Sequence, residues 1–221
     1  MKLYLDSADI AVWEELMPTG IFHGITTNPL LAARAGLSYP DINWQDLARR
    51  ARALDAKELH AQVYGPPEGY VEWAAQLYEA GRSHGLETVV KIPLVEKAIR
   101  ATPAVKALGG RILMTACYDV KQMFVAQGLG ADFIAPYFGR MIEAGIDAVA
   151  HLAAMKDMQT EGQGGCEVLV ASLRTTDQMI ELAGHGLDVF TIAPDITRAL
   201  LADNDRSAVA YAEFEKASRG Q

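Results

Sequence analysis

The sequence predicts a single (β/α)8 barrel, and three observations lead to that fold class. Short β-rich runs alternate with longer helical patterns along the whole chain of 221 residues. Eight such alternations are present, and parallel strands joined by helical crossovers form a sheet with helices outside it. No linker or low-complexity segment interrupts the pattern. Eight units in this length close naturally into one barrel domain that spans residues 1–221.

The predicted strands are short runs in which aliphatic and β-branched residues are frequent. Many of them end close to a glycine, a proline or a polar residue, which are the usual punctuation of a strand. The runs are Lys2–Asp6, Gly24–Thr27, Leu59–Tyr64, Thr88–Ile92, Arg111–Ala116, Asp132–Pro136, Glu167–Ser172 and Val189–Ala193.

The stretches between the strands are amphipathic. Their apolar residues recur at spacings of three and four, as in Val71, Ala74, Ala75 and Tyr78, which marks a helix with one buried face. The predicted helices are Trp44–Ala53, Gly69–His84, Glu96–Leu108, Asp119–Gly128, Gly145–Thr160, Thr176–Ala183 and Asp195–Ala202.

A last predicted helix, Ser207–Ala217, remains after the eighth unit. With Val209, Tyr211 and Phe214 it has apolar residues to spare, so it can pack on its own barrel or on a neighbouring subunit. The glycine-rich stretch 161–165 is interpreted as a turn between a helix and a strand, not as a domain boundary. The rival fold, an open doubly wound sheet, is weakened because no GxGxxG motif follows the first strand.

Composition and charge exclude several classes of protein. The net charge of −8 and the pI near 5.1 leave no basic stripe for a nucleic-acid backbone, whereas a small anion needs only a few local cations. No apolar stretch approaches the roughly 20 residues that cross a bilayer. Asp6 also interrupts the N-terminus where a signal peptide would stay hydrophobic. We expect a cytoplasmic protein with neither a membrane nor a nucleic-acid partner.

Metal and cofactor chemistry has little support in the sequence. Cys117 and Cys166 are too few for a disulfide framework, so reduced thiols are expected. The five histidines show neither HxH nor HExxH spacing, and His60, which alternates with Gln62, is more typical of a packed or exposed residue than of a catalytic one. The GxSxG and GxxxxGK[ST] motifs are absent as well. We expect no metal and no cofactor.

Lys91 is the most informative residue because it lies in an apolar run that ends at Pro93. An ammonium group between Val90 and Ile92 loses hydration, and desolvation lowers the pKa of a lysine from about 10.4. A neutral amine is the form that Schiff-base chemistry with a carbonyl substrate requires. The alternative is a lysine whose charged head snorkels to water at the end of the strand.

Polar residues occur at other strand ends too, where a barrel collects its chemistry. Each has an ordinary explanation. Asp6 can cap the next helix, and Thr27-Asn28-Pro29 can be a simple turn with proline at the first helical position. Gln62 is a buried amide that needs partners, either in a structural network or in a substrate. The strand-end residues are Asp6, Thr26, Asn28, Gln62, Lys91, Thr115, Tyr137, Arg140, Ser172 and Arg174.

The last three of these residues suit an anion. Ser172 and Arg174 place a hydroxyl and a guanidinium on the same side of an extended segment, and Arg140 follows the neighbouring strand. A phosphate could therefore be bound by three converging groups. Alternatively, both arginines are solvated surface charges, and Tyr137 buries its ring while its hydroxyl stays in water.

With these residues assembled, the chain resembles the small transaldolase-like family, and specifically its fructose-6-phosphate aldolase branch. The resemblance implies a (β/α)8 barrel in which Lys91 forms a Schiff base with a ketose phosphate. It also implies a homo-oligomer built on pentamers, either a pentamer or a decamer. The matching segments, in order along the chain, are Leu3–Asp6, Gly24–Pro29, Ala61–Val63, Val89–Pro93, Thr115–Tyr118, Ala135–Arg140 and Ala171–Arg174.

The resemblance also implies roles for the strand-end residues. The catalytic set would be Lys91, Tyr137, Gln62 and Asp6, with Gln62 and Tyr137 positioning a water or transferring a proton. Asp6 would hold a hydroxyl of the dihydroxyacetone unit. The other residues would bind substrate. Thr26, Asn28 and Thr115 would lie at the dihydroxyacetone unit. Arg140, Ser172 and Arg174 would bind the phosphate.

Gln62 and Tyr137 bear on which reaction the protein performs. Transaldolases of this superfamily typically have glutamate and phenylalanine there. A glutamate acts with water as acid and base, whereas a glutamine only orients. A tyrosine can protonate the enamine and so release dihydroxyacetone. The pair favours an aldolase that cleaves fructose 6-phosphate to dihydroxyacetone and glyceraldehyde 3-phosphate.

Two alternatives remain open. A transaldolase would pass the dihydroxyacetone unit from fructose 6-phosphate or sedoheptulose 7-phosphate to an aldose phosphate, and Phe138-Gly139 and Leu173-Arg174 are closer to the transaldolase form of these loops. A non-catalytic phosphosugar-binding barrel would keep the phosphate residues and make Lys91 incidental.

Overall fold

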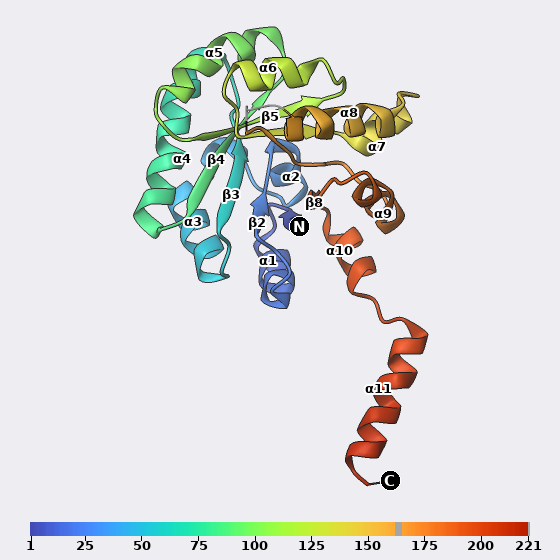
Figure 1. Ribbon diagram of the computed structural model, residues 1–221. Helices are drawn as coiled ribbons and strands as arrows, with labels where there is room; N and C mark the ends of the chain where they lie inside the picture. Colours follow the sequence, from blue (N-terminus) through green and yellow to red (C-terminus); the bar gives the residue numbers. More distant parts are fainter. Residues whose placement is uncertain (162–164, 221) are drawn as a thin grey trace.

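The computed structural model describes residues 1–161 and 165–220, and over these residues eight parallel strands form a nearly closed barrel (Figure 1). Hydrogen-bonded neighbours follow the order β7-β6-β5-β4-β3-β2-β1-β8, so each strand from β1 to β6 pairs with the next one along the chain, and β8 pairs with β1. This confirms the predicted fold class. The strands are β1 (Lys2–Asp6), β2 (Gly24–Thr26), β3 (Glu58–Gln62), β4 (Glu87–Pro93), β5 (Arg111–Cys117), β6 (Phe133–Pro136), β7 (Glu167–Val168) and β8 (Val189–Ile192).

The barrel closes through the segment that follows β7. Val170 forms an isolated parallel bridge with Phe190, in which the Val170 amide donates to the carbonyl of Val189 at 2.9 Å. The predicted strand Glu167–Ser172 is thus shorter in the structure, with a two-residue ladder followed by single bridges. Extended backbone ends at Ser172, whose φ of 64° lies in the left-handed region.

Eleven α-helices within the described residues surround or cover the strands, and most begin and end within a few residues of the prediction. They are α1 (Ile10–Leu16), α2 (Pro29–Arg34), α3 (Trp44–Ala53), α4 (Tyr70–His84), α5 (Glu96–Lys106), α6 (Gln122–Gly128), α7 (Phe138–Glu143), α8 (Ala148–Glu161), α9 (Thr176–Gly184), α10 (Pro194–Leu201) and α11 (Asp205–Ser218). Short 3₁₀ turns occur at Met17–Thr19, Tyr39–Asp41 and Pro67–Gly69.

Two helices begin later than predicted, for local reasons. The α6 helix starts at Gln122 because its side-chain oxygen accepts the backbone amides of Tyr118 and Asp119, which turns that segment into a loop. The α8 helix starts at Ala148, since Gly145 has a φ of 73° that a helix does not allow. The predicted turn at 161–165 lies largely outside the described residues.

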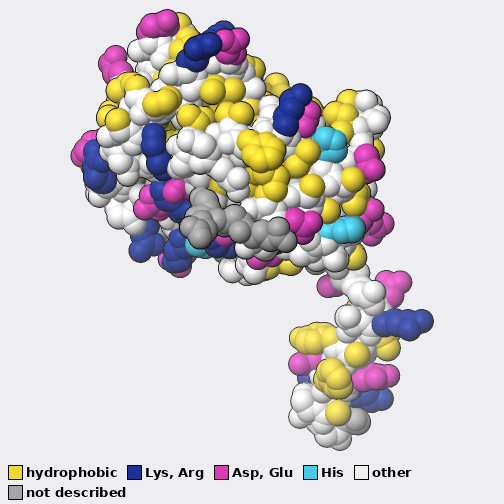
Figure 2. All heavy atoms as spheres, turned by 45° about the horizontal axis from the view of Figure 1, so that its top comes forward, with side chains coloured by type: hydrophobic (Ala, Val, Ile, Leu, Met, Phe, Trp, Pro, Cys, Tyr) yellow, Lys and Arg dark blue, Asp and Glu magenta, His cyan; other side chains and the backbone are white. Residues whose placement is uncertain are grey.

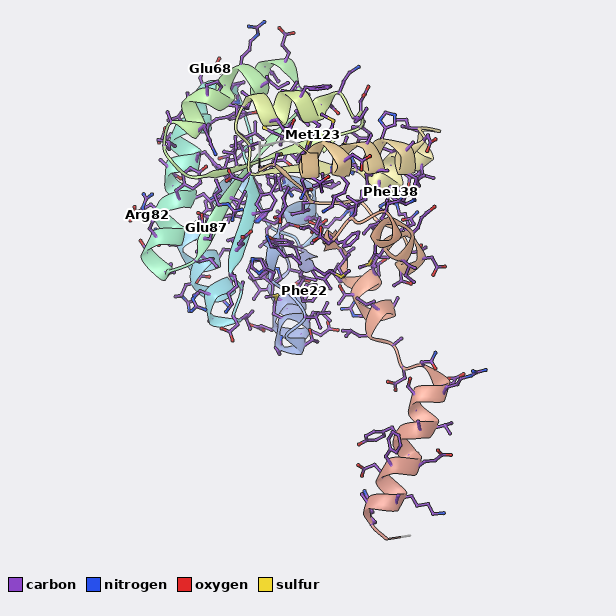
Figure 3. The ribbon with its side chains drawn as sticks, viewed as in Figure 1. Phe22, Glu68, Arg82, Glu87, Met123 and Phe138 are labelled. Carbon is purple, nitrogen blue, oxygen red and sulfur yellow. The ribbon has the colours of Figure 1, made fainter. Side chains whose placement is uncertain are left out.

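The apolar core has two parts, one between strands and helices and one inside the barrel. Alternate residues of each strand point to the two sides, so the interior set comes from all around the sheet. Phe138, labelled in Figure 3, belongs to the outer part and is 1 % exposed at the start of α7. The interior set is Tyr4, Val89, Leu113, Phe133, Ala135, Leu169, Ala171 and Val189.

The α11 helix extends away from the barrel beyond α10 (Figures 1 and 2). None of its described residues is buried, and Val209, Tyr211 and Phe214 are among the most exposed large apolar side chains. The helix was predicted to pack on its own barrel or on a neighbour, and in the monomer it does not pack on its own barrel. No helix within the described residues is long and apolar enough to cross a membrane.

Candidate active site

A pocket of about 520 Å³ opens at the carboxyl ends of the barrel strands. Chemistry in this fold collects at that end because each parallel strand delivers one side chain and one loop to the same rim. The structure brings all ten predicted site residues into the lining of this pocket. They are Asp6, Thr26, Asn28, Gln62, Lys91, Thr115, Tyr137, Arg140, Ser172 and Arg174.

Lys91 does not snorkel to solvent. Its side chain lies inside the barrel on β4, the residue is 5 % exposed, and Nζ donates to the backbone carbonyl of Thr27 at 3.1 Å. Among the described residues no carboxylate forms an ion pair with it. Burial therefore lowers the pKa of Lys91, and the charge of Asp6 opposes this only in part. Burial thus shifts this amine toward its neutral form.

Asp6 is aimed into the pocket and does not cap a helix. Asp9 caps α1 instead, where its side chain accepts the amide of Ala11. Asp6 Oδ1 accepts from the Thr26 hydroxyl at 2.6 Å, and Thr26 Oγ1 lies 2.5 Å from Thr191 Oγ1. The chain of hydroxyls holds one carboxylate oxygen, and the other accepts no hydrogen bond among the described residues.

Asn28 serves two purposes at the pocket rim. Its backbone is extended, and Oδ1 accepts the amides of Leu30 and Leu31 at 3.0 Å each, so it is the N-cap of α2. The ordinary explanation for this turn is therefore correct. It does not remove the functional one, because the cap uses only the oxygen and the side-chain NH₂ group remains a donor on a residue that lines the pocket.

Gln62 is the direct neighbour of Lys91 across the β3–β4 ladder, where the two residues are register partners. Its side chain is half-buried and lines the pocket, yet among the described residues it forms no side-chain hydrogen bond. A structural network is thus not what holds this amide. It is left as a group that can contact a substrate or a water molecule.

Tyr137 and Thr115 form the opposite wall. Their hydroxyl oxygens are 2.9 Å apart, and burial raises the pKa of Tyr137 although the hydrogen bond with Thr115 lowers it. The phenol is therefore neutral and carries a proton that it can donate. The ring of Tyr118 lies edge-on at 5.7 Å, and the guanidinium of Arg140 lies 5.2 Å from the Tyr137 ring centre.

Ser172, Arg174 and Arg140 form the cationic corner of the pocket. The Ser172 hydroxyl is buried and has no hydrogen-bond partner among the described residues. Arg174 Nε pairs with Glu143 Oε1 at 2.9 Å, but both side chains are about half exposed, so the pair is weak. An anion at this corner would give the orphaned hydroxyl a partner and draw on two guanidinium groups.

Some lining residues were not found from the sequence. Thr191 lies between Phe190 and Ile192 of β8 and bonds to Thr26, so alternation within an apolar strand would have been its signal. Arg34, at the end of α2, gave no signal because only the fold brings that short helix to the pocket. Within the described residues no group of three or more His, Cys, Asp or Glu side chains is arranged to hold a metal ion.

The sequence profile of the family described as "Transaldolase/Fructose-6-phosphate aldolase" matches residues 3–220. The chain belongs to this transaldolase/fructose-6-phosphate aldolase family. The predicted resemblance is therefore confirmed, and an enzyme is favoured over a non-catalytic barrel.

Several relatives in this family carry the name "Probable transaldolase". One from Rhizorhabdus wittichii is 31 % identical over 205 residues, which cover 90 % of this chain and 88 % of the relative. One from Cereibacter sphaeroides is 32 % identical over 206 residues, with the same coverage of 90 % and 88 %. These relatives carry the name of one activity, whereas the family description includes both.

Solved structures of more distant proteins have a fold similar to that of this chain. Mandelate oxidase with (S)-2-phenylpropionate and with benzoyl-formic acid each match with a TM-score of 0.63, at 14 % and 15 % identity. The match covers 90 % of this chain, which spans 66 % of the length of those chains. At that identity the likeness is one of fold alone.

Proposed function

We propose that the protein is a class I aldolase that reversibly cleaves fructose 6-phosphate to dihydroxyacetone and glyceraldehyde 3-phosphate. The observation that carries the proposal is the buried amine of Lys91 with Gln62 beside it and Tyr137 lining the same pocket. None of these three side chains is a carboxylate. These groups can thus orient and protonate, and the carboxylate of Asp6 in the same pocket is hydrogen-bonded by Thr26.

The reaction begins at the carbonyl carbon of the ketose, C2. The neutral Lys91 amine adds to C2, the C2 oxygen takes up protons and leaves as water, and an iminium ion forms with one proton gained from solvent. As a water molecule oriented by Gln62 takes the proton of the C4 hydroxyl, the C3–C4 bond breaks and its electron pair moves toward the iminium nitrogen. Glyceraldehyde 3-phosphate leaves, and a dihydroxyacetone enamine remains on Lys91. Protonation at C3 and hydrolysis of the iminium then release dihydroxyacetone and the free amine.

The remaining pocket residues support this sequence by position. Asp6 and Asn28, with Thr26 and Thr115 beside them, would hold the hydroxyls of the dihydroxyacetone unit. Tyr137 would supply the proton to C3, since burial keeps its phenol protonated. The phosphate would lie at the cationic corner described above, and sugar phosphates are substrates consistent with the family.

A transaldolase is the second candidate, and one observation favours it. The curated relatives described above carry that name. In a transaldolase the enamine is kept until an aldose phosphate such as erythrose 4-phosphate arrives. The two candidates share Lys91, the iminium and the enamine, and they differ in whether the enamine is protonated.

The deciding experiment supplies fructose 6-phosphate without an acceptor and measures free dihydroxyacetone. An aldolase releases dihydroxyacetone and glyceraldehyde 3-phosphate in equal amounts over many turnovers. A requirement for erythrose 4-phosphate would overturn the aldolase assignment in favour of transfer.

A second experiment tests the covalent step that both candidates need. Borohydride added with dihydroxyacetone should reduce the iminium and add its mass to the peptide that contains Lys91. Lys91→Met should abolish the adduct, and Lys97→Met, which replaces an exposed lysine on α5, should leave it intact. Active parent protein without an adduct at Lys91 would rule out the mechanism.

The division of labour between the two reactions can be tested on the same pocket. Gln62→Glu combined with Tyr137→Phe gives the deprotonation step a carboxylate and removes the proton donor for C3. The ratio of transfer to cleavage should rise by about tenfold or more, because one positioned acid or base contributes factors of this size. An unchanged ratio would show that other residues decide the fate of the enamine.

A further inference from the structure

Strand β3 extends beyond its neighbour β2 at the pocket end of the barrel. The last register pair between them is Thr26 with His60, whereas β3 continues to Gln62. On the β2 side of β3, the amide of Thr27 donates to the carbonyl of His60 at 2.8 Å. On the β4 side, the amide of Val63 donates to the backbone carbonyl of Lys91 at 3.0 Å. Since backbone groups alternate in direction along a strand, the amide and carbonyl of Gln62 point toward the missing continuation of β2.

The hydroxyl of Tyr39 occupies that position. It donates to the Gln62 carbonyl at 2.6 Å and accepts from the Gln62 amide at 3.0 Å. One oxygen thus satisfies both backbone groups of Gln62, which a longer β2 would otherwise have paired. Burial raises the pKa of Tyr39 well above its usual range, and the phenol therefore keeps the proton that it donates. Tyr39 is 6 % exposed, so little solvent reaches the position that its hydroxyl occupies.

An aromatic cluster fixes the ring of Tyr39. The Trp44 ring lies edge-on at 5.5 Å, the Tyr64 ring lies edge-on at 5.5 Å, and the Trp73 ring is stacked at 6.5 Å. These residues come from α3, from the loop after β3 and from α4. Tyr39 itself begins the 3₁₀ turn Tyr39–Asp41 between α2 and α3. Its hydroxyl is thus held at one place relative to β3.

We propose that Tyr39 is a positioning residue that fixes the direction of the Gln62 side chain through the Gln62 backbone. The side-chain amide of Gln62 forms no hydrogen bond among the described residues, so its aim depends on where its own backbone is held. The inference rests on the proposed function in one respect, namely that Gln62 orients a water or a substrate beside the Lys91 iminium. The clamp on the backbone exists independently of that reaction.

The test is Tyr39→Phe, which keeps the ring and removes only the bridging hydroxyl. Acceptor-free cleavage of fructose 6-phosphate should slow in kcat by about fivefold to tenfold, the factor expected for a lost neutral hydrogen bond. Borohydride trapping at Lys91 should keep its parent rate, because the hydroxyl contacts Gln62 and not the lysine. The matched control is Tyr64→Phe, which removes a hydroxyl from the same cluster that does not contact Gln62.

A double-mutant cycle with Gln62→Ala separates positioning from general stability. If Tyr39 acts through the Gln62 side chain, Tyr39→Phe should cause no further loss of kcat in the Gln62→Ala background. An equal loss in both backgrounds, or an equal loss from Tyr64→Phe, would overturn the proposal and leave Tyr39 a structural residue.

Hydrogen exchange tests the clamp without reference to catalysis. The Gln62 amide should exchange at least about tenfold faster in Tyr39→Phe than in the parent, and unchanged exchange would contradict the proposal. If the parent protein does not trap at Lys91, the proposed function fails, and the exchange rate of the Gln62 amide still decides whether Tyr39 holds that backbone.

Discussion

Lys91 is a buried amine that forms no ion pair among the described residues. It is 5 % exposed and donates to one backbone carbonyl, so its protonated form is poorly solvated in the folded state. Burial lowers the pKa of Lys91 there, whereas the unfolded chain restores it to about 10.4. The unfolded state then binds more protons between these two values, and the stability of the fold rises with pH across that interval.

Lys91→Met should therefore be inactive and yet more stable than the parent at pH 7. We expect a melting temperature higher by about 2–4 °C, the shift that about 1 kcal/mol produces in a chain of this size. The difference should shrink as the pH rises from the pKa of buried Lys91 toward about 10.4, because the parent's amine is then neutral in both states.

Thermal unfolding of both proteins across that pH range is the measurement. Lys97→Met replaces an exposed lysine and should show no such pH dependence. A Lys91→Met protein that is less stable at pH 7 would mean that the ammonium is well solvated in the fold.

The polar residues of the site were largely predictable, because each lies at the end of an apolar run. Ten of them meet around one pocket, although their roles stay predictions. Tyr39 could not be found in this way. Its partner Gln62 is 23 positions away in the sequence. The contact arises because β2 stops opposite His60, two residues short of the end of β3, and this offset is a property of the assembled sheet.

At the scale of elements, Gly139 is where α7 meets the loop that carries the cationic corner. Its amide donates to the Ser172 carbonyl at 2.9 Å. A Cβ atom at Gly139 would lie 2.2 Å from that carbonyl oxygen and 3.1 Å from Cγ of Arg174. The backbone of the loop therefore has to move if this position gains a side chain.

Gly139→Ala should raise KM for fructose 6-phosphate by about tenfold or more, since the displaced loop carries two of the three groups proposed to bind the phosphate. Borohydride trapping with unphosphorylated dihydroxyacetone should change little. Steady-state kinetics and trapping on one preparation make the comparison. Gly128→Ala, where a Cβ meets nothing within 4 Å, is the control. Parallel losses with both substrates would contradict a phosphate-specific effect.

Glu58 of β3 ties several strands together inside the barrel. It accepts from Tyr4 at 2.8 Å, from Arg111 at 2.8 Å, and lies 2.7 Å from His60 Nε2. Burial alone would raise the pKa of Glu58, but hydrogen bonds from His60 and Tyr4 and the charge of Arg111 lower it well below its usual range. The stability that Glu58 contributes is therefore complete above about pH 4.3 and is lost as the pH falls below that value.

Glu58→Gln should lower the free energy of unfolding by about 1.5–3 kcal/mol at pH 7, because the hydrogen bonds that the carboxylate accepts are replaced by weaker ones to a neutral amide. Denaturant titrations at pH 7 and at acid pH should show parent and variant converging as the pH falls. Glu79→Gln, which breaks an exposed pair with Arg82 on α4, should have little effect at either pH. A difference that persists in acid would point to lost packing instead of lost charge.

Element prediction succeeded where a pattern was long enough to be read. The 15 residues of α4 show their apolar repeat over several turns. The six residues of α2 and the six of α7 complete fewer than two turns, so no repeat could appear, and neither helix was predicted. Both cover the pocket end of the barrel, which is why the sequence located the site residues better than the walls around them.

At the scale of the whole molecule, none of the side chains of α11 is buried against the barrel within the described residues. Figure 3 shows its side chains with no barrel element beside them, and Val209, Tyr211 and Phe214 are 59 %, 66 % and 71 % exposed. A helix with such a face is stable in water mainly when it packs against something. We propose that it packs on a second copy of the chain in a homo-oligomer, in keeping with the predicted pentamer or decamer.

Deleting residues 203–221 should then reduce the assembly to smaller species without unfolding the barrel, whose pocket residues all precede the cut. Sedimentation velocity gives the mass, and trapping at Lys91 reports that the pocket is intact. Phe214→Glu should weaken assembly in the full chain, because it places a charge in the buried contact, whereas Lys216→Gln should not. If the truncated and full chains sediment as the same oligomer, the subunits meet through the barrels, and α11 has another partner.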